Sequence, residues 1–240
     1  WDGTAWHGMS PPNTSYSIGA VYGDANYLFA GTSSTLAWWD GSSWSSASLP
    51  ISATISDFEE YLGQLYLTGS GGFSGFLYWW DGSSFHGPGE VFNNDAYELH
   101  EYNGLLYVAG IWNIPGPPGT SYGVAVWDGA AWVPTSAEYP MGTEGMETLN
   151  GRLVLGGDFG VDSFDGDSHV PIASSSLYYA RDVKLYQGLL YVTGLFDQVE
   201  GTDSYYIAAW NDPVVGIDDK SSTPARTFMV NNCLLYTSPS

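Results

Sequence analysis

The chain has 240 residues, of which 44% are hydrophobic and 16% aromatic, so it holds enough apolar side chains for a sizeable folded core. Its 26 acidic and 5 basic residues give a formal net charge of −21, which would repel a nucleic-acid phosphate backbone and an anionic membrane surface. Cys233 is the only cysteine, which excludes an internal disulfide and a cysteine-built metal site, and no apolar run is long enough to insert into a membrane.

Two motifs alternate along the chain. The first reads WDGxxW, with copies that begin at Trp1, Trp39, Trp80 and Trp127, a weaker copy at Phe164 and a remnant at Trp210. The second reads Y-x-G-x-L-Y-x-x-G, with copies at 61–69, 102–110, 149–157 and 186–194 and a variant at 22–31 that has one more residue in its turn. Internal repetition of this kind is the signature of a repeat architecture.

The spacing of the motifs predicts the architecture. From each first aromatic residue to the final glycine of the next hairpin motif the distance is 30 residues in all five copies. The remaining stretch varies from 7 to 17 residues, so all insertions fall in one connection of the repeat. A period of 37 to 47 residues fits a propeller blade of four antiparallel strands.

The third repeat shows where the strands are expected. The first covers 96–102, the second 105–110, the third 123–127 and the fourth 130–134. Asn-Gly and Asp-Gly favour tight hairpin turns, because both central residues of such a turn need a positive φ. A two-residue turn at Asp128-Gly129 would pair Trp127 with Ala130. The predicted fold class is an all-β propeller of five four-stranded blades.

The fourth strand of the last repeat is not evident in its own sequence. We expect residues 1–9 to supply that strand and so to close the propeller, because pairing the first and last strands leaves no open edge. The alternative is that the chain is a fragment of a longer propeller. The predicted domains are a propeller at 1–212 and a flexible linker or tail at 213–240.

Residues 1–210 resemble bacterial secreted proteins with WDG-type, kelch-like propeller repeats, on the motifs given above. Residues 214–232 resemble the linker before a C-terminal sorting domain of the type IX secretion system. The last eight residues, CLLYTSPS, depart from the Pro-Asn-Pro-Phe motif that usually follows in this family and resemble translated adapter sequence. The resemblance implies a secreted protein located outside the cell or on its surface.

The variable connections should lie together at one end of the propeller, where we expect any ligand to bind. Aromatic rings there could stack on a sugar, while neighbouring carboxylates and amides accept its hydroxyl protons. The alternative is that Trp112 only covers the end of its own blade. The candidate ligand-binding residues are Trp112, Asn113, Tyr122, Phe196, Asp197, Glu200, Asp203 and Tyr205.

No catalytic constellation is recognisable, since the sequence has no HExxH, GxSxG or phosphate-loop motif. We expect no cofactor; a calcium ion is the one candidate, on Asp158, Asp162, Asp165 and Asp167, although Asp165 is better explained as a turn residue.

The leading functional hypothesis is a monomeric, non-enzymatic binding module whose partner is a polysaccharide or a cell-surface protein. The alternatives are a propeller glycoside hydrolase or lyase that uses carboxylates of the central channel, and a structural spacer in a cell-surface protein.

Overall fold

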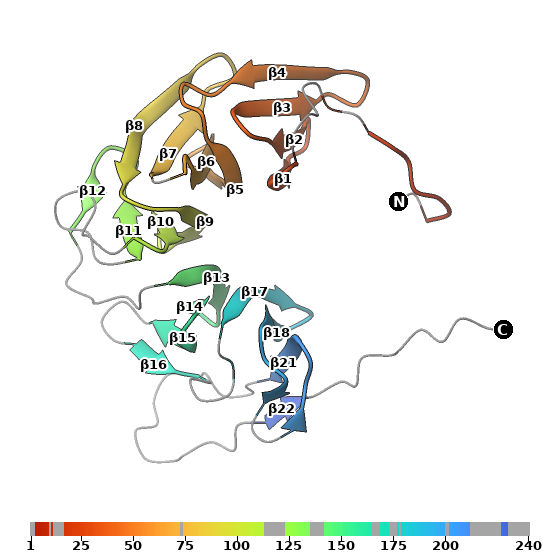
Figure 1. Cartoon of the computed structure of the whole chain (residues 1–240), viewed down its shortest axis with the longest axis vertical. Helices are drawn as coiled ribbons and strands as arrows, with labels where there is room; N and C mark the ends of the chain where they lie inside the picture. The colour runs from red at the N-terminus through yellow and green to blue at the C-terminus, as the bar shows by residue number, and fades with distance from the viewer. Residues whose placement is uncertain are drawn as a thin grey trace. The chain divides into compact units, whose positions relative to one another are not determined.

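The structure is a computed structural model, and it describes residues 3–9, 11, 17–72, 74–112, 123–134, 142–164, 169–172, 177, 179–199, 202–211 and 227–229. These residues form five four-stranded antiparallel sheets and one two-stranded hairpin, with no helix among them (Figure 1). The predicted all-β class with four strands in each repeat is confirmed.

The first three sheets each consist of four consecutive strands. The first sheet contains β1 (Ala20–Gly23), β2 (Leu28–Gly31), β3 (Thr35–Trp39) and β4 (Trp44–Ser48). The second contains β5 (Thr54–Tyr61), β6 (Gln64–Ser70), β7 (Gly75–Trp80) and β8 (Phe85–Phe92). The third contains β9 (Ala96–Tyr102), β10 (Leu105–Gly110), β11 (Val124–Trp127) and β12 (Trp132–Val133).

The last two sheets follow the same plan, with one insertion. The fourth contains β13 (Thr143–Leu149), β14 (Arg152–Gly157), β15 (Gly160–Phe164) and β16 (His169–Pro171). The fifth contains β17 (Ala180–Tyr186), β18 (Leu189–Gly194), β21 (Ile207–Asn211) and β22 (Thr227–Met229). The hairpin of β19 (Gln198–Val199) and β20 (Thr202–Asp203) lies between β18 and β21 in the chain.

The fourth strand of the fifth sheet is not the one expected. In the structure β22 pairs with β21, so that Trp210 lies opposite Phe228. Residues 3–9 form no strand, and the prediction that residues 1–9 complete the last sheet is therefore wrong for this structure. The prediction rested on the open edge that β21 would otherwise leave. In the structure β22, which lies within 213–240, pairs with that edge.

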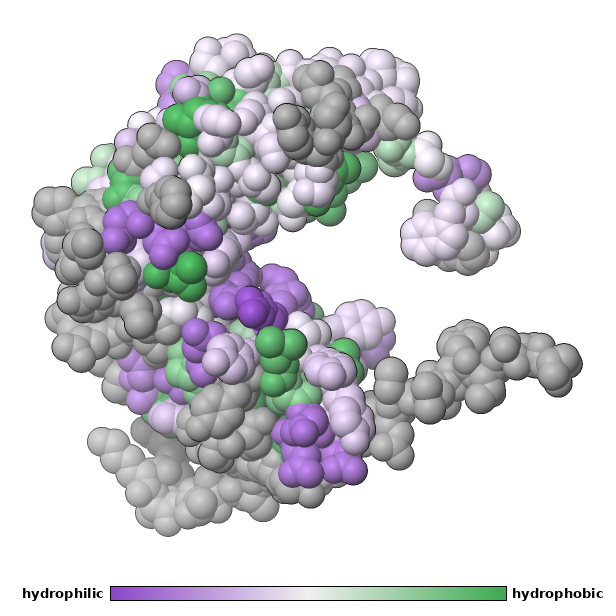
Figure 2. All heavy atoms as spheres, viewed as in Figure 1, coloured by the Kyte–Doolittle hydropathy of each residue, from purple (hydrophilic) through white to green (hydrophobic). Residues whose placement is uncertain are grey.

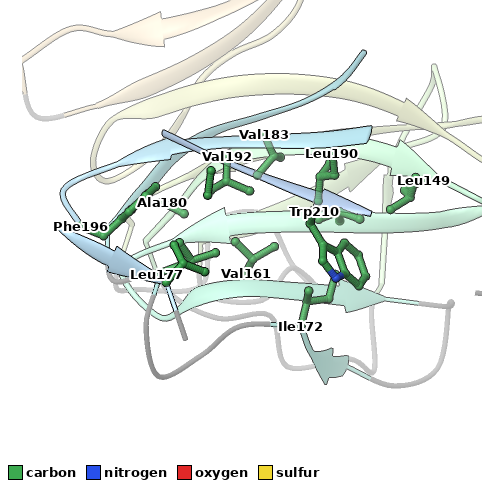
Figure 3. Packing of buried hydrophobic residues seen from close by; sticks show 13 residues of the cluster. Leu149, Val161, Ile172, Leu177, Ala180, Val183, Leu190, Val192, Phe196 and Trp210 are labelled. Carbon is green, nitrogen blue, oxygen red and sulfur yellow. The ribbon is translucent and has the colours of Figure 1, made fainter. Parts of the chain in front are cut away.

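The chain divides into two compact units. The first unit contains the first three sheets, apart from 109–111 and 121–124, and the second contains the fourth and fifth sheets. In each unit a cluster of buried hydrophobic residues lies between consecutive sheets. These clusters lie between the first and second sheets, between the second and third, and between the fourth and fifth; the last of them is drawn in Figure 3.

The turn between the first and second strands is a two-residue turn in four of the sheets. Its two central residues have positive φ in every case: 52° and 73° at Leu62-Gly63, 53° and 76° at Asn103-Gly104, 51° and 76° at Asn150-Gly151, and 51° and 79° at Gln187-Gly188. Such a turn matches the twist of the paired strands, as the sequence predicted. In all five sheets we call the end that carries the turn between the first and second strands the tight-turn end and the opposite end the connection end.

The WDG turns contain four residues rather than the two expected, so Trp127 pairs with Trp132 and not with Ala130. The aspartate explains the longer turn, because its Oδ1 accepts backbone N–H bonds from the residues two and three positions later. These bonds run at 2.7–2.8 Å from Ser42 and Ser43 to Asp40, from Ser83 and Ser84 to Asp81, and from Ala130 and Ala131 to Asp128.

The longer turn places two rings directly opposite each other at the end of the third and fourth strands. Ring centroids lie 5.6 Å apart for Trp39–Trp44, 4.7 Å for Trp80–Phe85, 5.0 Å for Trp127–Trp132 and 4.8 Å for Phe164–His169. Cross-strand pairs of this kind stabilise a hairpin. The two aromatic positions of the motif are therefore explained by the turn, without a ligand.

Carboxylates on the first strand of one sheet join it to the first strand of the next. The backbone N–H of Leu99 donates to Asp57 Oδ2 at 2.8 Å, and in the second unit that of Leu185 donates to Glu147 Oε2 at 3.0 Å. The first strand lies at the edge of its sheet, so these bonds satisfy amides on the edge. Part of the acidic charge of the chain therefore has a structural role.

Candidate functional site

The connection between the second and third strands of the fifth sheet carries the best-defined candidate site. Phe196 and Val199 are buried in the cluster between the fourth and fifth sheets, where Figure 3 shows Phe196 near Ala180 and Leu177. These two anchors fix the hairpin β19–β20 to the sheet. The hairpin also brings Asp197 and Asp203 to the surface, where Gln198 Nε2 donates to Asp203 Oδ1 at 3.3 Å.

Large apolar side chains are exposed around this hairpin. Tyr205 is 63% exposed and Tyr206 62%, although folded proteins normally bury most of a ring of this size. We define the tyrosine patch as Tyr179, Leu195, Tyr205, Tyr206 and Ile207, all of which are exposed. Figure 2 shows that hydrophobic residues, in green, reach the surface in this view as separate patches among hydrophilic and intermediate ones.

The backbone beneath the tyrosine patch is held in an unfavourable conformation. Tyr206 has a φ of 67° and Tyr179 a φ of 56°, in the left-handed region that bulky residues rarely adopt. Backbone bonds hold both: the Tyr206 N–H donates to Phe196 O at 2.9 Å, and the Leu195 N–H donates to Tyr179 O at 3.2 Å. Gly194 is required next to them, since a Cβ there would lie 2.3 Å from Tyr179 O. Strain maintained in this way is frequent at binding sites.

The predicted ligand-binding residues fall into three groups. Asp197, Asp203 and Tyr205 are exposed at the connection end of the fifth sheet, as the prediction requires of ligand-binding residues. Trp112 is fully buried in the cluster between the second and third sheets and stacks on Phe92 of β8 with centroids 4.1 Å apart, so its ring is not offered to a ligand. Phe196 is likewise a core residue. Asn113, Tyr122 and Glu200 lie outside the described residues.

Four members of the tyrosine patch were not predicted from the sequence. Tyr205 was named from the sequence, whereas Tyr179, Leu195, Tyr206 and Ile207 were not. A signal was present: the apolar residues Phe196 and Val199 of this segment are buried. Once they are assigned to the core, the neighbouring tyrosines remain for the surface.

The candidate calcium ligands do not form a described cluster. Within the described ranges, no group of three or more His, Cys, Asp or Glu residues could hold a metal ion. Asp165 and Asp167 lie outside those ranges. Asp162 is buried on β15, and burial raises the pKa of its carboxyl group above the usual value. Calcium therefore remains a prediction that the structure does not test.

The part of the chain that is described contains no helix that is long and apolar enough to cross a membrane.

No protein-family model matches the sequence, and no curated protein matches it either. Solved structures are similar in fold. A chain of the mitotic checkpoint complex matches with a TM-score of 0.53 and 13% identity, over 86% of this chain and 70% of that one. The WD40 domain of Neurospora crassa Pan2 matches with a TM-score of 0.53 and 11% identity, over 84% of this chain and 64% of that one. This protein therefore spans about two thirds of these chains and has the β-propeller fold.

Proposed function

We propose that this protein is an extracellular, non-enzymatic binding module that recognises a polysaccharide through the tyrosine patch. The observation that carries the proposal is the pair Tyr205 and Tyr206, exposed on a connection that is anchored by buried side chains and held by backbone hydrogen bonds. A rigid aromatic surface can stack on the apolar face of a sugar ring with little loss of entropy on binding.

The residues beside the patch supply the polar half of such a site. Asp197, Gln198 and Asp203 are exposed on the hairpin, and their oxygens can accept sugar hydroxyl protons. The extracellular location is supported by the charge of −21 and by the resemblance of the repeats to those of secreted proteins.

The test is binding of the full chain to a panel of immobilised polysaccharides, with Tyr205→Ala and Tyr206→Asn as site variants. Asparagine at 206 tolerates the left-handed backbone, so the ring is removed without new strain. Tyr186→Ala is the matched control, because Tyr186 is equally exposed but lies at the tight-turn end of the same sheet.

We expect selective binding to at least one polysaccharide, weakened about tenfold by each site variant and unchanged by the control. Equal binding by all four proteins would place the site elsewhere. No binding by the folded protein would contradict the carbohydrate proposal and favour a protein partner or a spacer role.

A further inference from the structure

We propose that the tight-turn end of the first and second sheets holds a second binding site, which takes an arginine or lysine side chain from a peptide segment of a partner protein. This site lies in the first unit and does not depend on the tyrosine patch.

The site exists because a short polar residue stands where the other hairpins have a larger one. In the second sheet Leu65 lies opposite Trp80 and pairs with Glu60, and the last pair before the turn is Tyr61–Gln64. In the first sheet Leu28 lies opposite Trp39 and pairs with Gly23, and the N–H of the next residue, Asp24, donates to Tyr27 O at 3.0 Å. Asp24 therefore stands at the position of Tyr61, and the first sheet has no ring there.

Tyr61 of the second sheet and Leu149 of the fourth fill the space to the next sheet. The Tyr61 ring is buried in the cluster between the second and third sheets, and its hydroxyl donates to Gly104 O at 2.9 Å. Tyr102 and Leu149, at the same position of their hairpins, are also buried. Where the first sheet has no such side chain, a cavity of about 400 Å³ remains between it and the second sheet.

The cavity has an aromatic lining. Phe29 and Trp38 contribute from the first sheet and Trp80 from the second, with the Trp38 and Trp80 ring centroids 5.5 Å apart. Tyr27, which is 41% exposed, stands in the four-residue turn at its edge. The volume is in the range of small-ligand sites and can hold one long side chain with part of its backbone.

Acidic groups stand beside these rings. Asp24 Oδ1 accepts the backbone N–H bonds of Asn26 and Tyr27 at 2.6 and 2.7 Å, while its Oδ2 accepts no hydrogen bond from the described residues. Asp81, across the cavity, is bonded to His86 Nε2 at 2.7 Å. None of the described lining residues is basic.

The charge selects the ligand. An anion would meet two aspartates and a chain with a net charge of −21, and a neutral apolar group would leave the Asp24 oxygen without a partner. A cation satisfies the carboxylates and is attracted to the faces of the aromatic rings. A protonated lysine or arginine combines this charge with an aliphatic stem that packs on the rings.

The experiment uses fluorescently labelled nine-residue peptides that differ only in the central residue: arginine, lysine, norleucine or glutamate. Binding to the full chain is measured by fluorescence anisotropy at low and high salt. The site variants are Asp24→Asn, which keeps the turn-forming oxygen and removes the charge, and Tyr27→Ala. Asp40→Asn is the matched control, since Asp40 makes the same kind of turn but does not line the cavity.

We expect the arginine and lysine peptides to bind about tenfold more tightly than the norleucine peptide, and the glutamate peptide not to bind. Each site variant should weaken binding of the arginine peptide about three- to tenfold, and Asp40→Asn should leave it unchanged. Equal affinity for arginine and norleucine, an equal effect of the control, or no binding by the folded protein would each overturn the proposal.

Discussion

The boundary between the first and second sheets differs from the boundary between the second and third at its tight-turn end. The second boundary is closed by Tyr61, which packs between the sheets and bonds to the backbone of the third. The first boundary has Asp24 at this position instead and contains a cavity. A difference of one residue in a hairpin thus separates a packed boundary from a potential binding site.

The two boundaries also differ along the first strands of their sheets. Matched by the WDG motif, with Trp39 opposite Leu28 and Trp80 opposite Leu65, Ala20 of the first sheet stands where the second has Asp57. Asp57 accepts a backbone bond from the third sheet, whereas Ala20 has no polar side chain and the mostly exposed Val21 is on the other face of the strand. The first boundary has instead the bond that the Tyr22 hydroxyl donates to Glu60 Oε2 at 3.2 Å.

The largest expected effect is that of opening the closed boundary. Tyr61→Ala should lower the free energy of unfolding of the first unit by about 3–5 kcal/mol, because it removes a buried ring and leaves a cavity. Urea denaturation followed by tryptophan fluorescence measures this. Tyr61→Phe, which loses only the hydroxyl bond, should cost about 1 kcal/mol. A loss below 1 kcal/mol in the alanine variant would show that Tyr61 does not hold the boundary closed.

A smaller effect is expected from removing the hydrogen bond between Leu99 and Asp57. Asp57→Ala should cost about 1.5–3 kcal/mol, because the amide of Leu99 loses a bond to a charged acceptor. The same denaturation experiment applies, with Val21→Ala as a control whose side chain makes no such bond and which should change stability by less than about 0.5 kcal/mol. Similar losses of stability in Asp57→Ala and Val21→Ala would show that the bond from Leu99 to Asp57 does not join the second and third sheets.

In the second unit, replacing Asp162 is expected to stabilise the protein, whereas the preceding substitutions destabilise it. Burial raises the pKa of its carboxyl group, so the folded protein holds its proton more tightly than the unfolded chain does. Its contribution to stability is therefore present below the unfolded pKa and lost as the pH rises through the folded pKa. Asp162→Asn should raise the Tm by about 2–4 °C at pH 7 and by less near pH 4. A lower Tm at pH 7 would show that Asp162 has a stabilising partner.

The smallest effect belongs to the turn aspartates. The bond from His86 and the amides of Ser83 and Ser84 hold the pKa of Asp81 below its usual range. The stability that Asp81 contributes is thus present above the unfolded pKa, near 3.8, and lost as the pH falls through the folded one. In a thermal scan series, Asp81→Asn should lower the Tm slightly above pH 5, and the difference from the wild type should shrink as the pH falls below 3. A constant difference over this range would contradict the assignment.

The sequence predicted the repeated strands well where local geometry determines them. The bounds 96–102 and 105–110 match β9 and β10, because Asn103-Gly104 adopts the positive φ angles that define the turn. The fourth strand begins two residues later than expected, at Trp132, because the Asp128 carboxylate captures two amides and lengthens the turn. The sequence alone does not distinguish this turn from a two-residue one.

The candidate sites were harder to predict, because they depend on which side chains the packing leaves exposed. Trp112 and Tyr205 both follow a second strand, yet Trp112 stacks on Phe92 and Tyr205 is exposed. The variant at 22–31 was interpreted as a hairpin with one more residue in its turn. In the structure Tyr22 pairs with Phe29 as Glu59 pairs with Tyr66, so Tyr22 corresponds to Glu59 and Asp24 stands at the position of Tyr61.

The central comparison is tested most directly by grafting the hairpin of the second sheet onto the first. Residues 24–27 would be replaced by the sequence of residues 61–64, YLGQ, which puts a tyrosine at position 24 as a counterpart of Tyr61. The measurement is the affinity of the graft for the arginine-centred peptide, with circular dichroism to show that the graft is folded. We predict that the wild type binds the peptide and that the folded graft does not. Unchanged binding by a folded graft would contradict the account.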